Sequence, residues 1–291
     1  LESFDTLAPR PGEVLVEVLN TAMNVGTERA MFLGTASREL PYGPGGSGVG
    51  KIVKLGRGVT GFKRGQLVAG PMSHASIHSL PANKAVPVDK DVSVEEAVFI
   101  HLAMISQQGI RMGRVAPNHR VVVLGQGVIG RIATLLARAL GAKVRCVTLG
   151  QTKLQQFGET DGLALNDSGA LEELALENAD VVIDATGHPE AIHTCLKACK
   201  TGGSIVLLGS NRGDTGQLDP RTTFLDKAVR VVGAHINNQE LLPADQGGDY
   251  LAEGKAILDS VKNGKLSFSQ LISSRLDYNE LERFYAKDLQ A

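Results

Sequence analysis

The chain has 291 residues, of which 43% are hydrophobic and 21% charged, and its formal net charge is −1. This length is long for one hydrophobic core and suggests two domains, while the near-zero charge offers no electrostatic footprint for nucleic acid or an anionic membrane. No apolar run approaches the ~20 residues that a membrane span needs, and nothing at the start of the chain predicts a signal peptide.

The first part of the chain, residues 1 to about 98, is rich in glycine and proline and contains short alternating segments. Apolar and polar residues alternate over 13–18 and 50–55, which predicts strands with one buried face. The turns Pro11-Gly12 and Gly56-Arg57-Gly58 separate such segments. We therefore expect an antiparallel, largely β domain here.

From about residue 100 onward, apolar runs alternate with helical stretches. The predicted strands span 121–124, 144–147, 181–184, 204–208 and 229–234. The predicted helices span 129–140, 189–200, 251–263 and 278–286. Strands that alternate with helices predict a parallel sheet with crossover helices.

The three cysteines, Cys146, Cys195 and Cys199, form no CxxC pair and no even framework. A disulfide framework and a cysteine-built structural zinc site are therefore both unexpected. Cys195 and Cys199 stand four residues apart on the predicted helix from Glu190 to Lys200, where they would be buried as small apolar side chains. We expect a reducing compartment, the cytoplasm.

A glycine-rich segment joins the first buried strand of the second region to its helix. Its six residues are Gly125, Gln126, Gly127, Val128, Ile129 and Gly130. In such a GxGxxG segment the first glycine makes the tight turn, the second admits a pyrophosphate, and the third lets helix and strand pack closely. Because the helix N-terminus adds unpaired N–H groups, we predict a binding site for NAD or NADP.

The next strand ends on Thr148, where the dinucleotide motif expects a carboxylate for the ribose hydroxyls. A carboxylate about 4 Å from a 2′-phosphate would repel it by roughly 4 kcal/mol at an effective dielectric of 20. Because this carboxylate is absent, the site is open to NADP, and Thr148, Gln151 and Lys153 are candidate partners of the extra phosphate. The alternative is that Thr148 merely ends the strand and both coenzymes are used.

Several segments together resemble the medium-chain dehydrogenase/reductase superfamily, over nearly the whole chain. They are Pro11–Val16, Gly50–Val59, Gly65–Val68, Asp180–Ile192 and Gly202–Gly209. The resemblance implies an α/β protein in which a GroES-like, β-rich catalytic domain (residues 1–98 and 245–291) is split around a Rossmann doubly wound parallel-sheet domain (99–244), with the active site in the cleft. It also implies a small-molecule substrate and a homodimer or homotetramer.

The resemblance breaks at the catalytic zinc. Zinc-binding members place a cysteine, a Gly-His-Glu tract and a third ligand where this chain has Val25, Gly45-Gly46-Ser47 and the vicinity of Ile100-His101. Valine and glycine offer no donor atom, and a serine hydroxyl is a poor one for zinc. The cysteine-rich structural zinc lobe is also missing. We predict no bound metal and interpret the chain as a polyol-dehydrogenase type that has lost its zinc.

Without zinc, a proton donor must stabilise the oxyanion as hydride moves. Thr27 matches the family's relay hydroxyl, although it could instead cap a helix start. His101 could act as general acid or base, or be structural, and Tyr42 could donate a phenolic proton or simply pack in its loop. Glu28 matches an acidic position near the lost zinc, and we expect it to face Arg29 or a helix N-terminus.

The resemblance also implies the remaining coenzyme contacts. They come from residues after the ends of the later strands and from one arginine of the catalytic domain: Thr186, Gly209, Ser210, Ala234, Ile236 and Arg275. Arg275 would reach the pyrophosphate, with a surface arginine as the alternative.

Three functions remain open. The first is zinc-independent, NAD(P)-dependent interconversion of a secondary alcohol, such as a polyol or sugar derivative, and a ketone. The tract from Leu40 to Gly45 resembles the zinc-free quinone reductases and favours the second, NADPH-dependent reduction of a quinone or enone. The third is a dinucleotide-binding protein without turnover.

Overall fold

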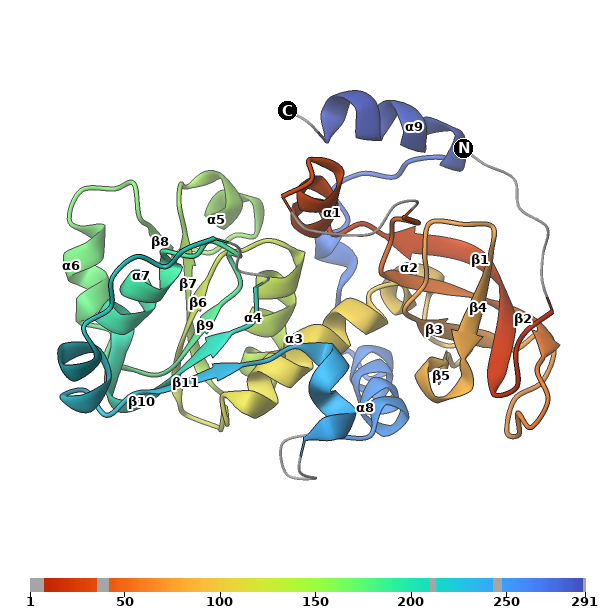
Figure 1. Ribbon diagram of the computed structural model, residues 1–291, viewed down its shortest axis with the longest axis horizontal. Helices are drawn as coiled ribbons and strands as arrows, with labels where there is room; N and C mark the ends of the chain where they lie inside the picture. Colours follow the sequence, from red (N-terminus) through yellow and green to blue (C-terminus); the bar gives the residue numbers. More distant parts are fainter. Residues whose placement is uncertain (1–7, 36–41, 210–212, 243–247, 290–291) are drawn as a thin grey trace. The chain divides into compact units, whose positions relative to one another are not determined.

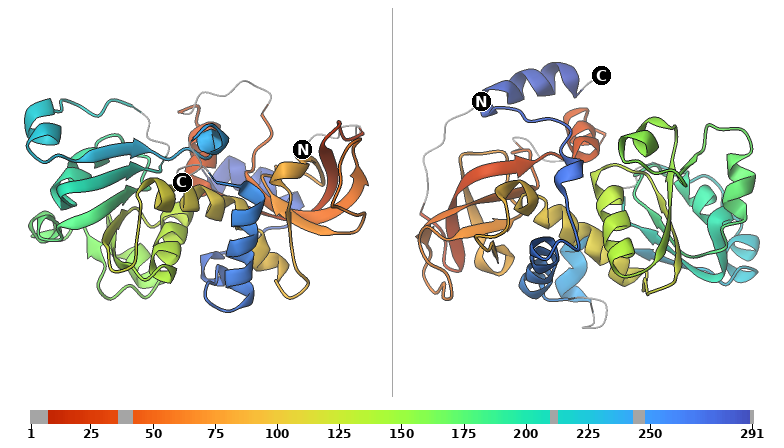
Figure 2. Two further views of the ribbon diagram at one scale, coloured as in Figure 1. Left: turned by 90° about the horizontal axis from the view of Figure 1, so that it is seen from below. Right: turned by 180° about the vertical axis from the view of Figure 1, so that it is seen from behind.

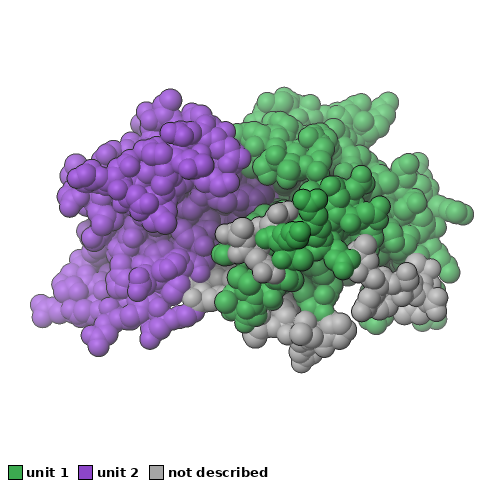
Figure 3. Space-filling view, turned by 90° about the horizontal axis from the view of Figure 1, so that it is seen from above, with its two compact units in different colours: residues 1–102, 249–291 green, residues 103–248 purple. Residues whose placement is uncertain are grey.

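The computed structural model describes residues 8–35, 42–209, 213–242 and 248–289 (Figure 1). The chain divides into two compact units, coloured separately in Figure 3. Unit 1 comprises Leu1–Leu102 and Asp249–Ala291, and unit 2 comprises Ala103–Gly248.

Unit 1 is built on a five-stranded antiparallel sheet with the order β4-β1-β2-β3-β5. The strands are β1 (Glu13–Ala22), β2 (Ser47–Leu55), β3 (Leu67–Gly70), β4 (Ile77–Pro81) and β5 (Val86–Pro87). The predicted alternation is real, because Val14 and Val16 are fully buried while Glu17 is exposed. These valines pack with Ile52 and Leu80 into the core of the sheet.

Short helices surround this sheet. They are α1 (Val25–Phe32), a 3-10 turn (Ala82–Lys84), α2 (Val94–Ala97), α8 (Tyr250–Lys262), 3-10 turns at Ser269–Leu271 and Tyr278–Glu280, α9 (Leu281–Arg283) and a π-helical turn (Phe284–Asp288). Helix α3 (Ile100–Met112) contains the boundary of the two units. The helix predicted over 278–286 is thus three short helical pieces of different pitch.

Unit 2 contains a six-stranded parallel sheet with the order β11-β10-β9-β6-β7-β8. The strands are β6 (Arg120–Leu124), β7 (Lys143–Thr148), β8 (Leu163–Ala164), β9 (Ala179–Asp184), β10 (Cys199–Leu207) and β11 (Arg230–Gly233). The chain winds outward from β6 to β8 and then from β9 to β11. The strand–helix alternation predicted this parallel sheet, and the family resemblance implied its doubly wound order.

The connections of unit 2 are α4 (Val128–Ala139), α5 (Thr152–Gln156), α6 (Ala170–Ala175), α7 (Ala191–Ala198), a π-helical turn (Arg221–Leu225) and a 3-10 helix (Ile236–Leu241). Right-handed crossovers running in opposite directions put α4 and α7 on opposite faces of the sheet (Figures 1 and 2). The switch in direction falls between β6 and β9, where Leu124 pairs with Asp184. Open α/β sheets bind ligands at the carboxyl ends of strands at such a point.

One sequence prediction about the cysteines is wrong. Helix α7 ends at Ala198, and Cys199 is extended (φ −76°, ψ 134°) and begins β10, where it pairs with Ala179. Cys195 and Cys199 therefore do not share a helix, although both are buried as expected. The apolar run favoured helix, but the parallel ladder to β9 extends the strand five residues earlier than predicted.

No helix in the described part of the chain is both long and apolar enough to cross a membrane.

Candidate active site

The segment from β6 to α4 has the geometry of a dinucleotide loop. Gly125 has φ +84°, in the left-handed region that favours glycine. A Cβ on Gly130 would lie 1.8 Å from the Gly125 carbonyl oxygen, so this contact between helix and loop requires glycine. A Cβ on Gly127 would meet nothing within 4 Å, so Gly127 faces open space. The three glycines thus divide into a turn, a packing contact and an open approach, as the motif predicted.

The loop presents backbone atoms rather than side chains. Gln126 is 2% exposed, and its amide donates to the Val123 carbonyl (3.3 Å) and accepts from the Thr134 hydroxyl (3.3 Å). Val128 and Ile129 are the first residues of α4, and their N–H groups precede the first bond of the helix, which runs from the Arg131 N–H to the Gly127 carbonyl (2.8 Å). These donors and the positive end of the helix dipole suit a pyrophosphate, so the loop fits NAD or NADP.

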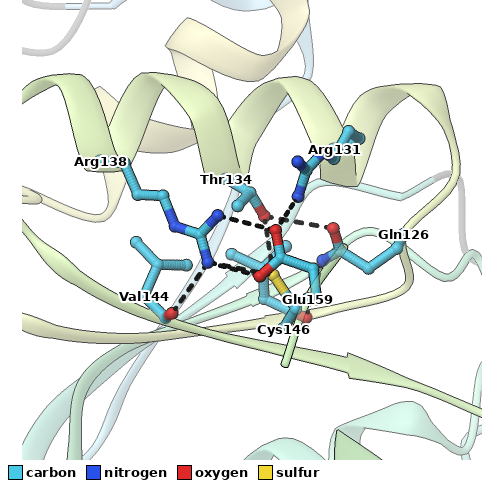
Figure 4. Close-up of polar contacts among 8 residues, drawn as sticks. Gln126, Arg131, Thr134, Arg138, Val144, Cys146 and Glu159 are labelled. Carbon is cyan, nitrogen blue, oxygen red and sulfur yellow. Dashed lines mark hydrogen bonds and ion pairs between the residues drawn. The ribbon is translucent and has the colours of Figure 1, made fainter. Parts of the chain in front are cut away.

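A cluster of charged side chains holds α4 to the segment after α5 (Figure 4). The Arg131 and Glu159 side chains are buried, whereas Arg138 is 40% exposed. Glu159 accepts from Arg138 (2.6 and 2.7 Å) and from Arg131, whose guanidinium also lies 4.6 Å from the Phe157 ring centre. The hydrogen bonds from Arg138 and Arg131 lower the pKa of Glu159 to about 2 despite its burial. Cys146 lies beside Arg138, and burial raises the pKa of its thiol. The cluster anchors the region where the adenosine ribose is expected.

The end of β7 carries no carboxylate. Thr148 is 7% exposed, and its hydroxyl donates to the Gly150 carbonyl at 2.8 Å. Lys153 is exposed and donates to the side-chain oxygen of Gln156 at 3.0 Å, while Gln151 donates to Asp167. The Thr148 hydroxyl is thus engaged locally, and Lys153 places an exposed cation in this segment.

The strand ends across the switch point pack tightly. The hydroxyl and the N–H of Thr186 donate to the buried Asp184 carboxylate at 2.6 and 2.9 Å. A Cβ on Gly209 would lie 2.5 Å from the Gly187 nitrogen, so these two loops touch through their backbones. Ser210 lies outside the described residues.

The last predicted coenzyme contacts of unit 2 follow β11. Ala234 is buried and its N–H donates to the Leu207 carbonyl at 3.0 Å. Ile236 opens the 3-10 helix, next to His235 at the N-cap. Both residues follow the carboxyl end of a strand, where the sequence placed them.

In unit 1 the structure gathers a chain of hydrogen-bonded side chains around Glu28. The Glu28 carboxylate accepts from the Asn24 N–H (3.2 Å), from His74 Nε2 (3.1 and 3.2 Å) and from the Tyr285 hydroxyl. The second ring nitrogen of His74, Nδ1, lies 2.6 Å from the Thr21 hydroxyl. Burial and the neighbouring carboxylate raise the pKa of Tyr285, so its phenol stays protonated and can donate.

This arrangement corrects the expectation for Glu28. Its principal partners are His74 and Tyr285, not Arg29, whose Nε donates to the Leu289 carbonyl at 3.2 Å. The expected helix N-terminus contributes one bond, from the Asn24 N–H.

The predicted catalytic candidates of unit 1 fall in two places. Thr27 is half-buried in the first turn of α1, and Asn24 occupies the N-cap, so Thr27 does not cap this helix. Tyr42 is partly buried and near enough to help raise the pKa of Tyr285. Both therefore belong to the surroundings of Glu28.

His101 stands apart from that group, in a pair with Tyr250. The two side chains are joined by a 2.8 Å hydrogen bond between Nδ1 and the phenol oxygen. Burial, with a smaller contribution from Lys84, lowers the pKa of His101 to about 4. The ring is therefore neutral near pH 7.

Arg275 pairs with Glu95 in unit 1. Its Nε and Nη2 atoms lie 2.9 and 2.7 Å from one Glu95 oxygen, and both side chains are more than half exposed. Exposed pairs of this kind contribute about 0–1 kcal/mol, so a phosphate could compete for the guanidinium.

The tracts expected to carry zinc ligands do not fit the metal. Val25 is apolar and 50% exposed, the Ser47 hydroxyl donates to the Val98 carbonyl at 2.5 Å, and His101 is bonded to Tyr250. Within the ranges that the structure describes, no three His, Cys, Asp or Glu side chains are grouped to hold a metal ion. The donor set is that of a hydrogen-bonding site.

Comparison with known families matches both units. The family described as "Zinc-binding dehydrogenase" matches residues 128–245, and "Alcohol dehydrogenase GroES-like domain" matches residues 10–86. The chain belongs to the medium-chain dehydrogenase/reductase superfamily. This is a superfamily of NAD(P)-dependent oxidoreductases, so the chain is assigned to the enzymes.

Individual relatives of this medium-chain dehydrogenase/reductase are distant. L-galactonate-5-dehydrogenase of Escherichia coli (strain K12) is 26% identical over 261 residues, covering 76% of this chain and 75% of that protein. A probable D-xylulose reductase A of Aspergillus clavatus is 25% identical over 229 residues, covering 75% of this chain but 60% of its own length. A Sinorhizobium meliloti structure, described as a zinc-binding dehydrogenase bound to NADP, shares the fold (TM-score 0.81, 21% identity, 97% of this chain and 90% of that one).

Sequence reasoning missed three members of the Glu28 group, Thr21, His74 and Tyr285. His74 was given no role because it belongs to no ligand motif, and Tyr285 lies 257 residues from Glu28. One signal was available: His74 stands three residues after the Gly70-Pro71 pair, near the place where the resemblance puts the structural zinc lobe of zinc-binding members.

Proposed function

We propose that this protein is an NAD(P)-dependent alcohol dehydrogenase that interconverts a secondary alcohol, of the polyol or sugar-derived class, and a ketone without a zinc ion. The observation that carries the redox part is the open, glycine-built loop between β6 and α4, shaped for a pyrophosphate. The sugar and polyol substrates in the names of the two relatives support the substrate class.

The bound coenzyme would supply or accept the hydride at its nicotinamide ring. The backbone N–H groups at the start of α4 bind its pyrophosphate, and the ends of β9 and β10 border the switch point. The hydroxyl groups around Glu28 supply hydrogen-bond donors for a substrate oxygen, which is the role that zinc plays elsewhere in the family.

The decisive experiment compares a panel of polyols oxidised with NAD or NADP against a panel of quinones and enones reduced with NADPH or NADH, together with elemental analysis. We expect turnover of a polyol, no stoichiometric zinc, and coenzyme binding that survives chelators. One tightly held zinc per chain would overturn the metal-free assignment. Activity on enones alone would favour the quinone-reductase alternative. Tight coenzyme binding without any turnover would favour a dinucleotide-binding protein.

The loop can be tested separately by Gly127→Ala. Since its Cβ would enter open space at an ordinary φ, this variant should fold with unchanged stability but weaken both coenzymes. Gly130→Ala is the contrasting variant, because its Cβ collides with the Gly125 carbonyl and should lower the free energy of unfolding by about 1–3 kcal/mol. Unchanged coenzyme affinity in Gly127→Ala would remove the loop from the site.

We further propose that NADPH binds at least as tightly as NADH, because no carboxylate at Thr148 repels the 2′-phosphate. Fluorescence titration of both coenzymes tests this. Lys153→Ala should weaken NADPH about two- to fivefold and leave NADH unchanged, as expected for an exposed ion pair. A tenfold preference for NADH would show that the interpretation of Thr148 is wrong. A homodimer or homotetramer in the cytoplasm remains our expectation.

A further inference from the structure

The side chains around Glu28 form one continuous chain from Thr21 through His74 and Glu28 to Tyr285. Its middle is shielded from solvent, since the His74 and Glu28 side chains are 3% and 4% exposed. Its two ends, Thr21 and Tyr285, are only half-buried. A buried polar path between two half-buried residues that carry hydroxyl groups suits a proton relay.

Each member can both take up and release a proton. With hydrogen on His74 Nε2, which faces the Glu28 carboxylate, the neutral ring leaves Nδ1 to accept from the Thr21 hydroxyl. An imidazole can take a proton at one nitrogen and release one from the other. The carboxylate and the two hydroxyls can do the same at oxygen.

Packing alone does not account for this group. A buried carboxylate stabilises a fold poorly, because its desolvation offsets most of what its partners contribute. The group also bridges the two tracts where relatives bind zinc. Glu28 lies on the helix that Val25 opens, and the His74 N–H donates to the Pro44 carbonyl beside Gly45.

We propose that Tyr285 is the proton donor to the substrate oxygen, and that Glu28, His74 and Thr21 relay protons to it from solvent. This inference rests on the proposed dehydrogenase function and names its acid. In ketone reduction, the Tyr285 hydroxyl turns its one hydrogen from Glu28 to the substrate oxygen. Hydride from the coenzyme forms the new C–H bond, and the C=O π pair becomes an O–H bond to that proton. The Glu28 carboxylate first takes the hydrogen of His74 Nε2 while His74 Nδ1 takes that of Thr21, which is reprotonated by water. The protonated Glu28 then passes its proton to the Tyr285 oxygen. The net change is ketone, NAD(P)H and one proton to alcohol and NAD(P)⁺, and alcohol oxidation runs the same path in reverse.

The test compares Tyr285→Phe with Tyr278→Phe. Tyr278 belongs to the same C-terminal segment but is 45% exposed, so its variant is the matched control. Tyr285→Phe keeps the ring against Phe32 and removes only the hydroxyl. We expect kcat to fall by roughly 10²–10⁴, the usual contribution of a positioned acid, with NADPH affinity unchanged and little change in KM.

Two further measurements separate a relay from a structural latch. Thr21→Val cuts the solvent end with an isosteric side chain, so it should lower kcat and change the solvent deuterium isotope effect on it. Added imidazole should restore part of the kcat that His74→Ala loses. If the group only holds the C-terminal segment against α1, imidazole should restore no activity.

The outcomes keep the two proposals distinct. The relay is overturned if the wild type turns over substrate and the variants Tyr285→Phe, Tyr278→Phe and Thr21→Val all keep its kcat and its isotope effect. The proposed dehydrogenase function is unaffected by that result. In that case a lower melting temperature in Tyr285→Phe would identify a latch between the C-terminal segment and α1. NADPH binding without wild-type turnover on any substrate overturns both.

Discussion

Two buried carboxylates, Glu159 in unit 2 and Glu28 in unit 1, each collect three or more donors, yet the partners differ in kind. Glu159 is held by two guanidinium groups, which keep their protons at any physiological pH. Glu28 is held by an imidazole, a phenol and a backbone N–H, of which the first two can exchange protons. Arginine partners keep their protons and hold the carboxylate as an anion, whereas imidazole and phenol partners can exchange protons with the carboxylate. The comparison therefore assigns anchoring to Glu159 and proton transfer to Glu28.

The largest effect that could break this comparison is on turnover. Glu28→Gln removes a proton-exchanging group from the relay, so kcat should fall on the order of 10²-fold or more. Glu159→Gln should leave kcat at the wild-type value, because its cluster touches no reacting group. Steady-state kinetics on the first active substrate, with folding checked by circular dichroism, provide the measurement. Equal losses in the two variants would show that the carboxylates share one structural role.

The second effect concerns stability in acid. Glu159 has a pKa of about 2 in the folded protein, below its ordinary value of 4.5, so its contribution is full above about pH 5 and disappears as the pH falls toward 2. This shift corresponds to at most about 3 kcal/mol. The stability difference between wild type and Glu159→Gln in denaturant should narrow across that range. Glu172→Gln, on the exposed side of α6, is the control; a pH-independent difference for Glu159→Gln would contradict the ion-pair account.

The smallest effect concerns His101, a buried titratable group outside both carboxylate clusters. Because its pKa is about 4 in the folded protein and near 6.5 in the unfolded chain, the unfolded chain binds the proton first. Stability should thus fall as the pH drops below 6.5, by about 1 kcal/mol at one unit below it. His101→Gln should remove this slope, and exposed His188→Gln should keep it. A catalytic His101 would instead alter the pH profile of kcat.

Local patterns were sufficient to predict the geometry of the glycine-rich loop between β6 and α4. The roles of Gly125, Gly127 and Gly130 follow from a turn, an open approach and a contact within six residues of one another, so they could be predicted from the sequence. Periodicity likewise predicted the parallel sheet with crossover helices, although Cys199 pairs with β9 and belongs to a strand rather than to the predicted helix. Such local features depend on residues that are close together in the sequence, so the sequence pattern reveals them.

The sequence by itself determined the superfamily, the two kinds of sheet, the phosphate loop and the loss of zinc donors at Val25 and the Gly45–Ser47 tract. Only the tertiary structure decided what surrounds Glu28, because His74 and Tyr285 lie 46 and 257 residues away from it. No periodicity links such positions. They meet because the antiparallel sheet brings residue 74 back to β1 and the C-terminal segment returns to α1. A hydrogen-bond network depends on where side chains converge in space, and that is set by the fold as a whole.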